Sequence, residues 1–289
     1  MTEFLQFLLA GLVIGSIYGI VGIGYTVIYN VTGIVNFAQG EFAMLGAFLA
    51  SLLIEGGMPL PLAAVASICA VALIAAAIER YAIRPAGGNV LFAIIITIGV
   101  GIVLQGVVVA IWGTDARTIP SFSSAAALDL GGVTIPSQSL WVLGSACALM
   151  MALTYFFNST YLGKAFRACA VNPSAARLVG IETQSMSVIA FVISGALGAI
   201  AGLLVAPISL VQYDTGIALG IKGFVACIVG GLGRPGGAMV GGLVLGASEA
   251  FASGYLSSGY KNAIAFVLLL LFLRLRPQGL LGDLERTGR

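Results

Sequence analysis

The polar side chains that stand within the long apolar runs of this 289-residue chain are few. The densest group is the segment 36–42, Asn-Phe-Ala-Gln-Gly-Glu-Phe, which holds two carboxamides and a carboxylate. Such groups are costly in lipid unless they face a partner, a cavity or water, so they mark candidate paths for a polar solute. The candidates for lining a path of this kind are Asn36, Gln39, Glu41, Gln105 and Glu249.

The same residues have a second, structural interpretation. Asn36 could cap a helix that follows it, because an asparagine side chain accepts hydrogen bonds from the free N–H groups at a helix start. Glu41 would then lie in the first turn and a half, where a helix N-terminus favours a negative charge. Glu249 either pairs with a basic residue or faces a cavity. Both interpretations, structural and ligand-contacting, stay open for these carboxylates.

The sequence does not indicate catalysis. It contains no histidine, which removes the commonest general base and metal ligand. The four cysteines show no CxxC spacing, which favours small buried apolar residues over a metal or redox site. The Gly-x-x-x-x-Gly-Lys-Ser/Thr phosphate loop is also missing from the sequence. We therefore expect no enzyme activity, no catalytic residue, no metal and no cofactor in this chain.

The elements that must position these polar groups are membrane helices. The chain is 60% hydrophobic and 8% charged, whereas soluble domains carry about 25% charged residues. A membrane crossing needs about 20 apolar residues, so the chain has room for eight to ten spans and for no separate soluble domain. We expect an all-α polytopic bundle of about nine transmembrane segments that forms a single domain over residues 1–289.

Nine apolar segments are the predicted spans, at about 5–29, 37–54, 60–80, 90–113, 139–158, 188–208, 217–232, 237–255 and 260–275. Polar or short segments predict broken or re-entrant helices near 36–42 and 217–236, and the span count around 217–255 is open by one. Gly11, Gly15 and Gly19 follow at intervals of four, which predicts close contact with another helix. Lys222 and Lys261 lie near predicted span ends, where lysine side chains reach to the interface.

The basic residues set the predicted orientation. They fall on alternating loops of one side, which the positive-inside rule assigns to the cytoplasm. With nine crossings, the N-terminus is outside and the C-terminus is cytoplasmic. The residues that carry this assignment are Arg80, Arg84, Lys164, Arg167, Arg177, Arg234, Arg274, Arg276, Arg286 and Arg289.

The cytoplasmic loop 159–187 contains a short predicted helix. Asn172 is a capping residue and Pro173 suits the first helical position, while Gly180 can close the helix in a left-handed conformation. The helix carries the small residues Ala175 and Ala176, with basic residues around it. It either closes the loop at the membrane surface or docks into a groove on a cytoplasmic partner, where arginines would form a polar rim.

Together these motifs resemble the permease subunits of the branched-chain amino-acid ABC importers. The resemblance rests on segments 36–41, 163–181 and 230–233, and on the ending Phe272…Arg276-Pro277-Gln278-Gly279-Leu280. Their order and spacing match over nearly the whole chain, and the chain looks like the smaller of the two permeases. The related urea and short-amide importers share these motifs, so urea or a short amide is the alternative substrate.

The resemblance implies a multi-pass protein of the bacterial inner membrane that moves branched-chain or other small amino acids into the cytoplasm. The implied partners are a second permease in a heterodimer, two cytoplasmic ATPase subunits, an extracytoplasmic solute-binding protein and the lipid bilayer, with no nucleic acid. ATP would be hydrolysed by the partners, and loop 159–187 would couple to them. The implied coupling residues are Lys164, Arg167, Asn172, Pro173, Ala175, Ala176, Arg177, Gly180 and Ile181.

An alternative from a different class is an ion-coupled secondary carrier that works alone. Glu41 and Glu249 would then be its coupling carboxylates. A carrier of this kind has no need of a capped docking helix with a basic rim, so the loop 159–187 favours the importer subunit.

Overall fold

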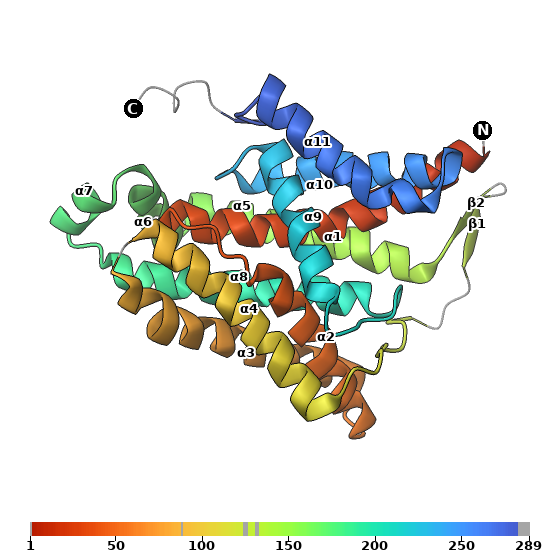
Figure 1. Ribbon diagram of the computed structural model, residues 1–289, viewed down its shortest axis with the longest axis horizontal. Helices are drawn as coiled ribbons and strands as arrows, with labels where there is room; N and C mark the ends of the chain where they lie inside the picture. The colour runs from red at the N-terminus through yellow and green to blue at the C-terminus, as the bar shows by residue number, and fades with distance from the viewer. Residues whose placement is uncertain (1, 88, 124–126, 131–132, 283–289) are drawn as a thin grey trace.

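The computed structural model describes residues 2–87, 89–123, 127–130 and 133–282, and it is almost entirely helical, as predicted (Figure 1). The long helices are α1 (Thr2–Thr32), α2 (Gln39–Glu55), α3 (Leu60–Ile78), α4 (Val90–Trp112), α5 (Ser137–Ser159), α8 (Thr183–Val205), α9 (Thr215–Gly230), α10 (Pro235–Tyr255) and α11 (Lys261–Leu275). Two shorter helices, α6 (Tyr161–Val171) and α7 (Pro173–Leu178), join α5 to α8. The strands β1 (Leu128–Leu130) and β2 (Val133–Ile135) form a small antiparallel hairpin.

Each of the nine segments predicted as a span is a helix. Within the described residues, six helices are long and apolar enough to cross a membrane alone, and α9 with α10 adds a seventh if that bent pair is one span. Helix α2 has 17 residues, fewer than the roughly 20 that a crossing needs. The all-α class is therefore confirmed, whereas nine crossings stay a prediction.

The two helix breaks fall near the predicted positions. Residues 33–38 separate α1 from α2 without helical structure. Helices α9 and α10 meet at an angle of 114° across a short break. The predicted capping of α2 by Asn36 is wrong, because α2 begins at Gln39 and has no side-chain cap. Asn36 Oδ1 instead accepts from the Ala38 N–H at 3.2 Å, which folds the break itself into an asparagine turn.

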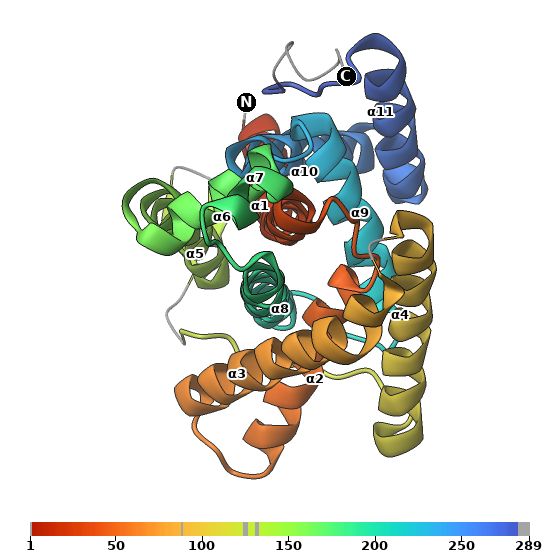
Figure 2. The same cartoon turned by 90° about the vertical axis from the view of Figure 1, so that its left-hand side faces the viewer.

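The centre of the bundle is built from α1 and α8, which Figure 2 shows surrounded by the other helices. The predicted glycine face of α1 packs on α10. A Cβ atom added at Gly15 would lie 2.6 Å from the Gly242 carbonyl oxygen, and one added at Gly11 would lie 2.6 Å from Ala247 Cα. Backbones this close exclude any larger residue. The predicted close helix contact is therefore confirmed.

Two of the motifs noted in the sequence contact each other. The N–H groups of Leu280 and Leu281 donate to the carbonyls of Val229 and Gly230 at 2.8 and 3.0 Å. A Cβ atom at Gly279 would lie 2.5 Å from Gly231 Cα, so the glycines let the two backbones meet. The segment after α11 thereby closes the end of α9, whose last carbonyls have no partner inside the helix.

The two ends of the molecule differ in character. Figure 1 shows the start of α1 and the β1–β2 hairpin at one end, and α6 with α7 at the other. Figure 2 shows α9 between α4 and α11 along one side of the bundle. The side formed by α4, α9 and α11 and the end formed by α6 and α7 hold most of the polar contacts of the candidate site.

Candidate functional site

Glu41 lies where three helices converge. Its side chain is 3% exposed, and its Oε1 atom accepts a hydrogen bond of 2.7 Å from Gln105 Nε2 on α4. On the other side it faces the start of α9, where a Cβ atom at Gly216 would lie 2.6 Å from the carboxyl carbon. Glu41 Oε2 is buried without a hydrogen-bond partner among the described residues. Sequence analysis named Glu41 and Gln105 separately, and the structure pairs them.

The starts of α2 and α9 meet beside this carboxylate. A Cβ atom at Gly40 would lie 2.6 Å from the Gly220 nitrogen, and one at Gly220 would lie 3.3 Å from Gly40 Cα. The approach requires glycine at position 40, and a side chain at position 220 would be tight. The free N–H groups at a helix start carry partial positive charge, so two helix starts stabilise the negative charge of Glu41. The favourable position expected for Glu41 in its own helix is thus shared with a second helix.

Gln39 joins α1, α2 and α8. Its Nε2 atom donates to the Ser194 carbonyl at 3.1 Å, and its Oε1 atom contacts the Ser194 hydroxyl. The Ser194 hydroxyl also lies 2.9 Å from the Gly24 carbonyl and donates to one acceptor at a time. Gln39 and Ser194 are both fully buried. Sequence analysis missed Ser194, because a single serine in an apolar helix gives no signal of its partner.

Asn36 is fully buried in the break between α1 and α2, and its Nδ2 atom has no partner among the described residues. The next residue, Phe37, donates its N–H to Thr97 Oγ1 on α4 at 3.2 Å. The Phe37 ring packs on Phe224 of α9 with centroids 5.5 Å apart. The break is therefore held against both α4 and α9.

Glu249 belongs to a second buried cluster. Lys222 Nζ on α9 lies 3.0 Å from Glu249 Oε2 on α10, and the Tyr18 hydroxyl on α1 donates to the same oxygen at 2.9 Å. Lys222 Nζ also donates to the Tyr18 oxygen at 3.0 Å. The prediction places Lys222 at an interface, whereas its Nζ atom is held by Glu249 of α10 and Tyr18 of α1. Of the two alternatives for Glu249, this conformation shows the pairing with a basic residue.

Helix α9 links the two clusters. Its first turn touches Glu41, and its third turn supplies Lys222 to Glu249. The five candidate path residues thus form two groups. Glu249 lies on the far side of α9, and the other four lie around the start of α2: Asn36, Gln39, Glu41 and Gln105. Their side chains connect helices in this conformation, and three of their polar atoms lack partners among the described residues: Asn36 Nδ2, Glu41 Oε2 and Glu249 Oε1.

The short helix predicted in loop 159–187 is α7, and its predicted cap is confirmed. Asn172 Oδ1 accepts from the N–H groups of Ser174 and Ala175, each at 3.0 Å, and Pro173 is the first helical residue. Gly180 has a φ of +86°, the left-handed conformation expected at this position. Ala175 is exposed, whereas Ala176 is 3% exposed and packs inside the chain. Ala176 therefore offers little surface to a partner.

Sequence analysis missed α6, which precedes α7. A Cβ atom at Gly163 would lie 2.6 Å from Phe157 Cα, so glycine allows the sharp turn from α5. Lys164 lies over the Tyr161 ring, and Arg167 donates to Asn158 Oδ1 at 3.2 Å. The apolar side of α6 packs inward, and burial raises the pKa of the Cys169 thiol against the opposing effect of the Arg177 charge. Cys169 is therefore a neutral packing residue.

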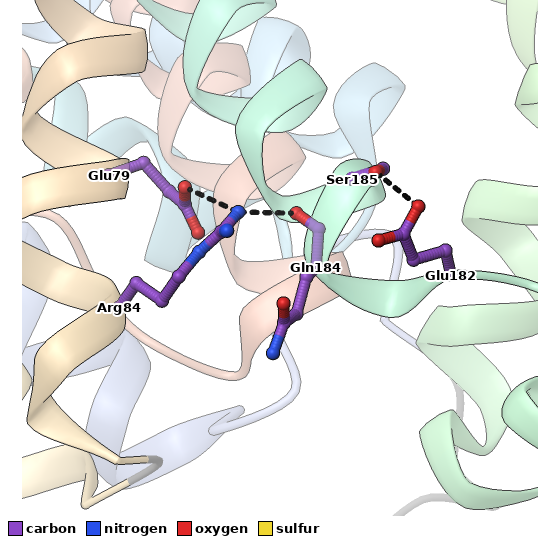
Figure 3. Close-up of polar contacts among 5 residues, drawn as sticks. All are labelled: Glu79, Arg84, Glu182, Gln184 and Ser185. Atoms are coloured by element: carbon purple, nitrogen blue, oxygen red, sulfur yellow. Dashed lines mark hydrogen bonds and ion pairs between the residues drawn. The ribbon is translucent and has the colours of Figure 1, made fainter.

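A polar junction connects segment 159–187 to α3 (Figure 3). Helix α3 continues into a π-helical turn at Glu79–Ile83. Arg84 Nη2 lies 3.3 Å from Glu79 Oε2 and donates to the Gln184 carbonyl of α8 at 3.5 Å. The Glu79 side chain is 3% exposed, so a nearly buried charge is paired here. Arg177 Nε of α7 donates to Thr183 Oγ1 at 2.9 Å, which joins α7 to the start of α8.

Comparison with known proteins gives a consistent result along the chain. A family model described as the permease component of a branched-chain amino acid transport system matches residues 7–273. The high-affinity branched-chain amino acid transport system permease protein BraD of Pseudomonas aeruginosa is 36% identical, with 98% of this chain and 97% of that protein covered. The LivH protein of Escherichia coli, of the same description, is 35% identical, with 98% and 96% covered. PsaBC from Streptococcus pneumoniae, solved in complex with Fab, has a TM-score of 0.54 at 15% identity over 96% of this chain and 93% of that chain, which is a likeness of fold alone.

Proposed function

This chain belongs to the branched-chain amino acid transport system permease family, and we propose on that basis that it forms part of the membrane passage of an ABC importer for branched-chain amino acids. The observation that carries the proposal is the whole-length similarity to BraD and LivH, at 36% and 35% identity. The resemblance that the sequence motifs indicated is thereby confirmed at the level of the family.

The importer would contain this chain, a second permease, two cytoplasmic ATPase subunits and an extracytoplasmic solute-binding protein. Our proposed orientation in the bacterial inner membrane has nine crossings, the N-terminus outside and the C-terminus in the cytoplasm. The placement of α6 and α7 at the end opposite the start of α1 supports this orientation (Figure 1). The basic residues of segment 159–187 would then face the cytoplasm, as the positive-inside rule requires.

We propose that α7 is the docking element for the ATPase subunits. Three aliphatic side chains next to its cap and end are almost fully exposed: Val171, Leu178 and Val179 at 81%, 89% and 76%. A groove on a partner would remove this apolar surface from water. Lys164, Arg167 and Arg177 lie around it and would form the polar rim, while Asn172, Pro173, Ala175, Ala176, Gly180 and Ile181 give the docking element its shape.

Movement of α7 has a route into the membrane helices. The Arg177–Thr183 contact joins α7 to α8, and the Arg84–Gln184 contact joins α8 to the end of α3. Both contacts are made by arginine, whose planar fork can hold two acceptors at once. Closure of the ATPases would therefore displace α8 and α3 together.

We propose that Asn36, Gln39, Glu41, Gln105 and Glu249 line or gate the path in another conformation. The support is the set of buried polar atoms without described partners, since such atoms are unfavourable unless another state or a ligand satisfies them. The glycine contacts between α2 and α9 bring the two helix backbones together beside Glu41, so a shift of either helix would change the surroundings of this carboxyl group.

The test is uptake by the purified complex in proteoliposomes with ATP inside and the solute-binding protein outside. We expect uptake of labelled leucine, isoleucine and valine that requires ATP, and none by this chain alone. Uptake of urea or acetamide without leucine uptake would replace the substrate class. Leucine uptake by the single chain, driven by an ion gradient and without ATP, would contradict the importer and support an independent carrier.

A further inference from the structure

A cavity of about 300 Å³ lies between α9 and α11. Its lining combines two opposite charges, an amide and apolar side chains: Asp214, Ile217, Ala218, Ile221, Lys222, Asn262, Ala265 and Phe266. We propose that this cavity binds the transported amino acid as a zwitterion, with its carboxylate at Lys222, its ammonium group at Asp214 and its aliphatic side chain against the isoleucines. The inference rests on the proposed import function and names the site that this chain contributes to it.

Lys222 can accept a further partner. An ammonium group has three N–H donors, and two of them are directed to Glu249 Oε2 and to the Tyr18 hydroxyl, each at 3.0 Å. The third donor remains for a ligand in the cavity, which the Lys222 side chain reaches with 14% of its surface exposed. The contact with Glu249 fixes the position of the Lys222 Nζ atom, so a ligand carboxylate meets a prepared donor.

Asp214 supplies the opposite charge at the start of the same helix. Its side chain is exposed and makes no hydrogen bond or ion pair within the described part of the chain. The Glu41 carboxyl group lies near the same helix start, against Gly216. A ligand ammonium group beside Asp214 would therefore be close to two carboxyl groups. This end of the cavity therefore favours a positive group for reasons that do not depend on Lys222.

The spacing of the two charges suits a small zwitterion. Asp214 and Lys222 are eight residues apart, which corresponds to about 12 Å along a helix axis at 1.5 Å per residue. The ammonium and carboxylate groups of an amino acid, each extended by one hydrogen bond, bridge most of this length, and the side chains supply the rest. An uncharged amide, or a molecule with one charge, would leave one of the two groups without a partner.

The wall between the charges is apolar. Ile217, Ile221 and Phe266 present large apolar side chains, and Ala218 and Ala265 leave space between them. A branched aliphatic side chain would lose its contact with water there, which is favourable by about 25 cal/mol for each Å² buried. The volume lies at the lower limit for small-molecule sites, about 300 to 1,000 Å³. The cavity thus fits one small apolar amino acid.

The direct test is protection of a cysteine in the cavity wall. In the assembled complex, with Cys69, Cys147, Cys169 and Cys227 replaced by alanine, Ile221→Cys is labelled with a water-soluble thiol reagent. We expect millimolar leucine to slow labelling at least about threefold, and leucinamide and 4-methylpentanoate, which lack one charge each, to leave it unchanged. Leu256→Cys is the control, since Leu256 is 73% exposed at the end of α10 and does not line the cavity.

A second variant tests the role of Lys222. The triple change Lys222→Met, Tyr18→Phe and Glu249→Leu removes both buried charges and the hydroxyl between them and keeps apolar volume, so it leaves no member of the cluster unpaired. We expect the complex to assemble, leucine to give no protection at Ile221→Cys, and leucine uptake to fall more than tenfold. Protection and uptake equal to those of the parent complex would overturn the inference.

Failure of the inference and failure of the proposed function give different results. A complex that imports leucine but shows no leucine protection at Ile221→Cys would contradict the cavity and leave the importer intact. A complex that imports no branched-chain amino acid would contradict the proposed function, and the protection assay would then be read with the solute that it does import.

Discussion

The Gln105 amide on α4 donates a 2.7 Å hydrogen bond to the carboxylate of Glu41 in the first turn of α2. The same carboxyl group packs against the start of α9 at Gly216. A single buried carboxyl group therefore contacts two helices besides its own, and one of its oxygens has no hydrogen-bond partner among the described residues.

The change Glu41→Gln tests whether that charge matters for transport. Glutamine keeps the size of the side chain and its hydrogen-bonding capacity, so the helices should still pack. We expect ATP-driven leucine uptake to fall by about tenfold, because two helix starts lose the negative charge that they stabilise. The measurement is uptake by proteoliposomes at equal amounts of assembled complex.

The matched control is Glu3→Gln, since Glu3 is exposed in the first turn of α1. It should leave uptake unchanged. Equal uptake by the Glu41 and Glu3 variants would show that the charge of Glu41 has no role in transport.

The change Gly40→Ala tests the contact between α2 and α9. An added Cβ would lie 2.6 Å from the Gly220 nitrogen, and backbone atoms cannot yield as a side chain can. We expect a loss of about 1–3 kcal/mol in stability, the usual cost of overpacking, seen as a lower melting temperature in detergent.

Gly106→Ala is its control, because a Cβ at Gly106 on α4 meets nothing within 4 Å. Alanine there should keep or raise the melting temperature. A Gly40 variant as stable as the Gly106 variant would contradict the close contact between α2 and α9.

The change Leu178→Glu tests docking at α7. Leu178 is 89% exposed, so a charge there should cost the isolated chain little. In a docked complex the same charge would be buried against the partner, which is unfavourable without a counter-charge. We expect the ATPase subunits to be lost during co-purification while the chain still inserts into the membrane.

Leu256→Glu is the matched control at the other end of the molecule, where an aliphatic side chain is also 73% exposed. It should retain the ATPases. Because Ala176 is buried, a bulky residue there would disturb α7 itself, and Ala175→Glu is the cleaner second probe of docking. Normal co-purification of the Leu178 and Ala175 variants would count against α7 as the docking element.

The change Arg84→Gln tests transmission from α8 to α3. It removes the ion pair with Glu79 and the contact with the Gln184 carbonyl. We expect ATP hydrolysis to continue and leucine uptake per ATP to fall several-fold, since movement of α8 would no longer carry α3 with it. The ratio is measured in one preparation from phosphate release and labelled leucine.

Arg80→Gln, four residues earlier and exposed, is the control and should keep the ratio of the parent. A parallel loss of hydrolysis and uptake in the Arg84 variant would instead indicate a defect of assembly.

The sequence predicted the long helices and the Asn172 cap, because these depend on neighbours along the chain, whereas it missed α6 and placed a cap wrongly at Asn36. The apolar runs, the break at 33–38 and the Asn172 cap all follow from local composition. The partners of buried polar groups could not be predicted in this way. Gln105 and Glu41 are 64 residues apart, and Ser194 and Gln39 are 155 apart.

Lys222 is another residue whose polar partner could not be predicted from the local sequence. A lysine near the end of an apolar run is expected to reach water, and that expectation assumes a helix that crosses the membrane along its normal. Helix α9 is instead bent from α10 by 114°, and its third turn carries Lys222 to Glu249 of α10. A Cβ atom at Gly237 would lie 2.5 Å from the Gly230 carbonyl oxygen, so glycines let α9 and α10 meet closely beside this bend.

The contact between the segment after α11 and the end of α9 also constrains the order of biosynthesis. The carbonyls of Val229 and Gly230 receive the N–H groups of Leu280 and Leu281, which are made about 50 residues later. Until those residues leave the ribosome, the two carbonyl groups at the end of α9 lack these hydrogen-bond donors. Carbonyl groups without donors are costly in the membrane. Final seating of α9 between α4 and α11 is therefore one of the last events in the maturation of the subunit.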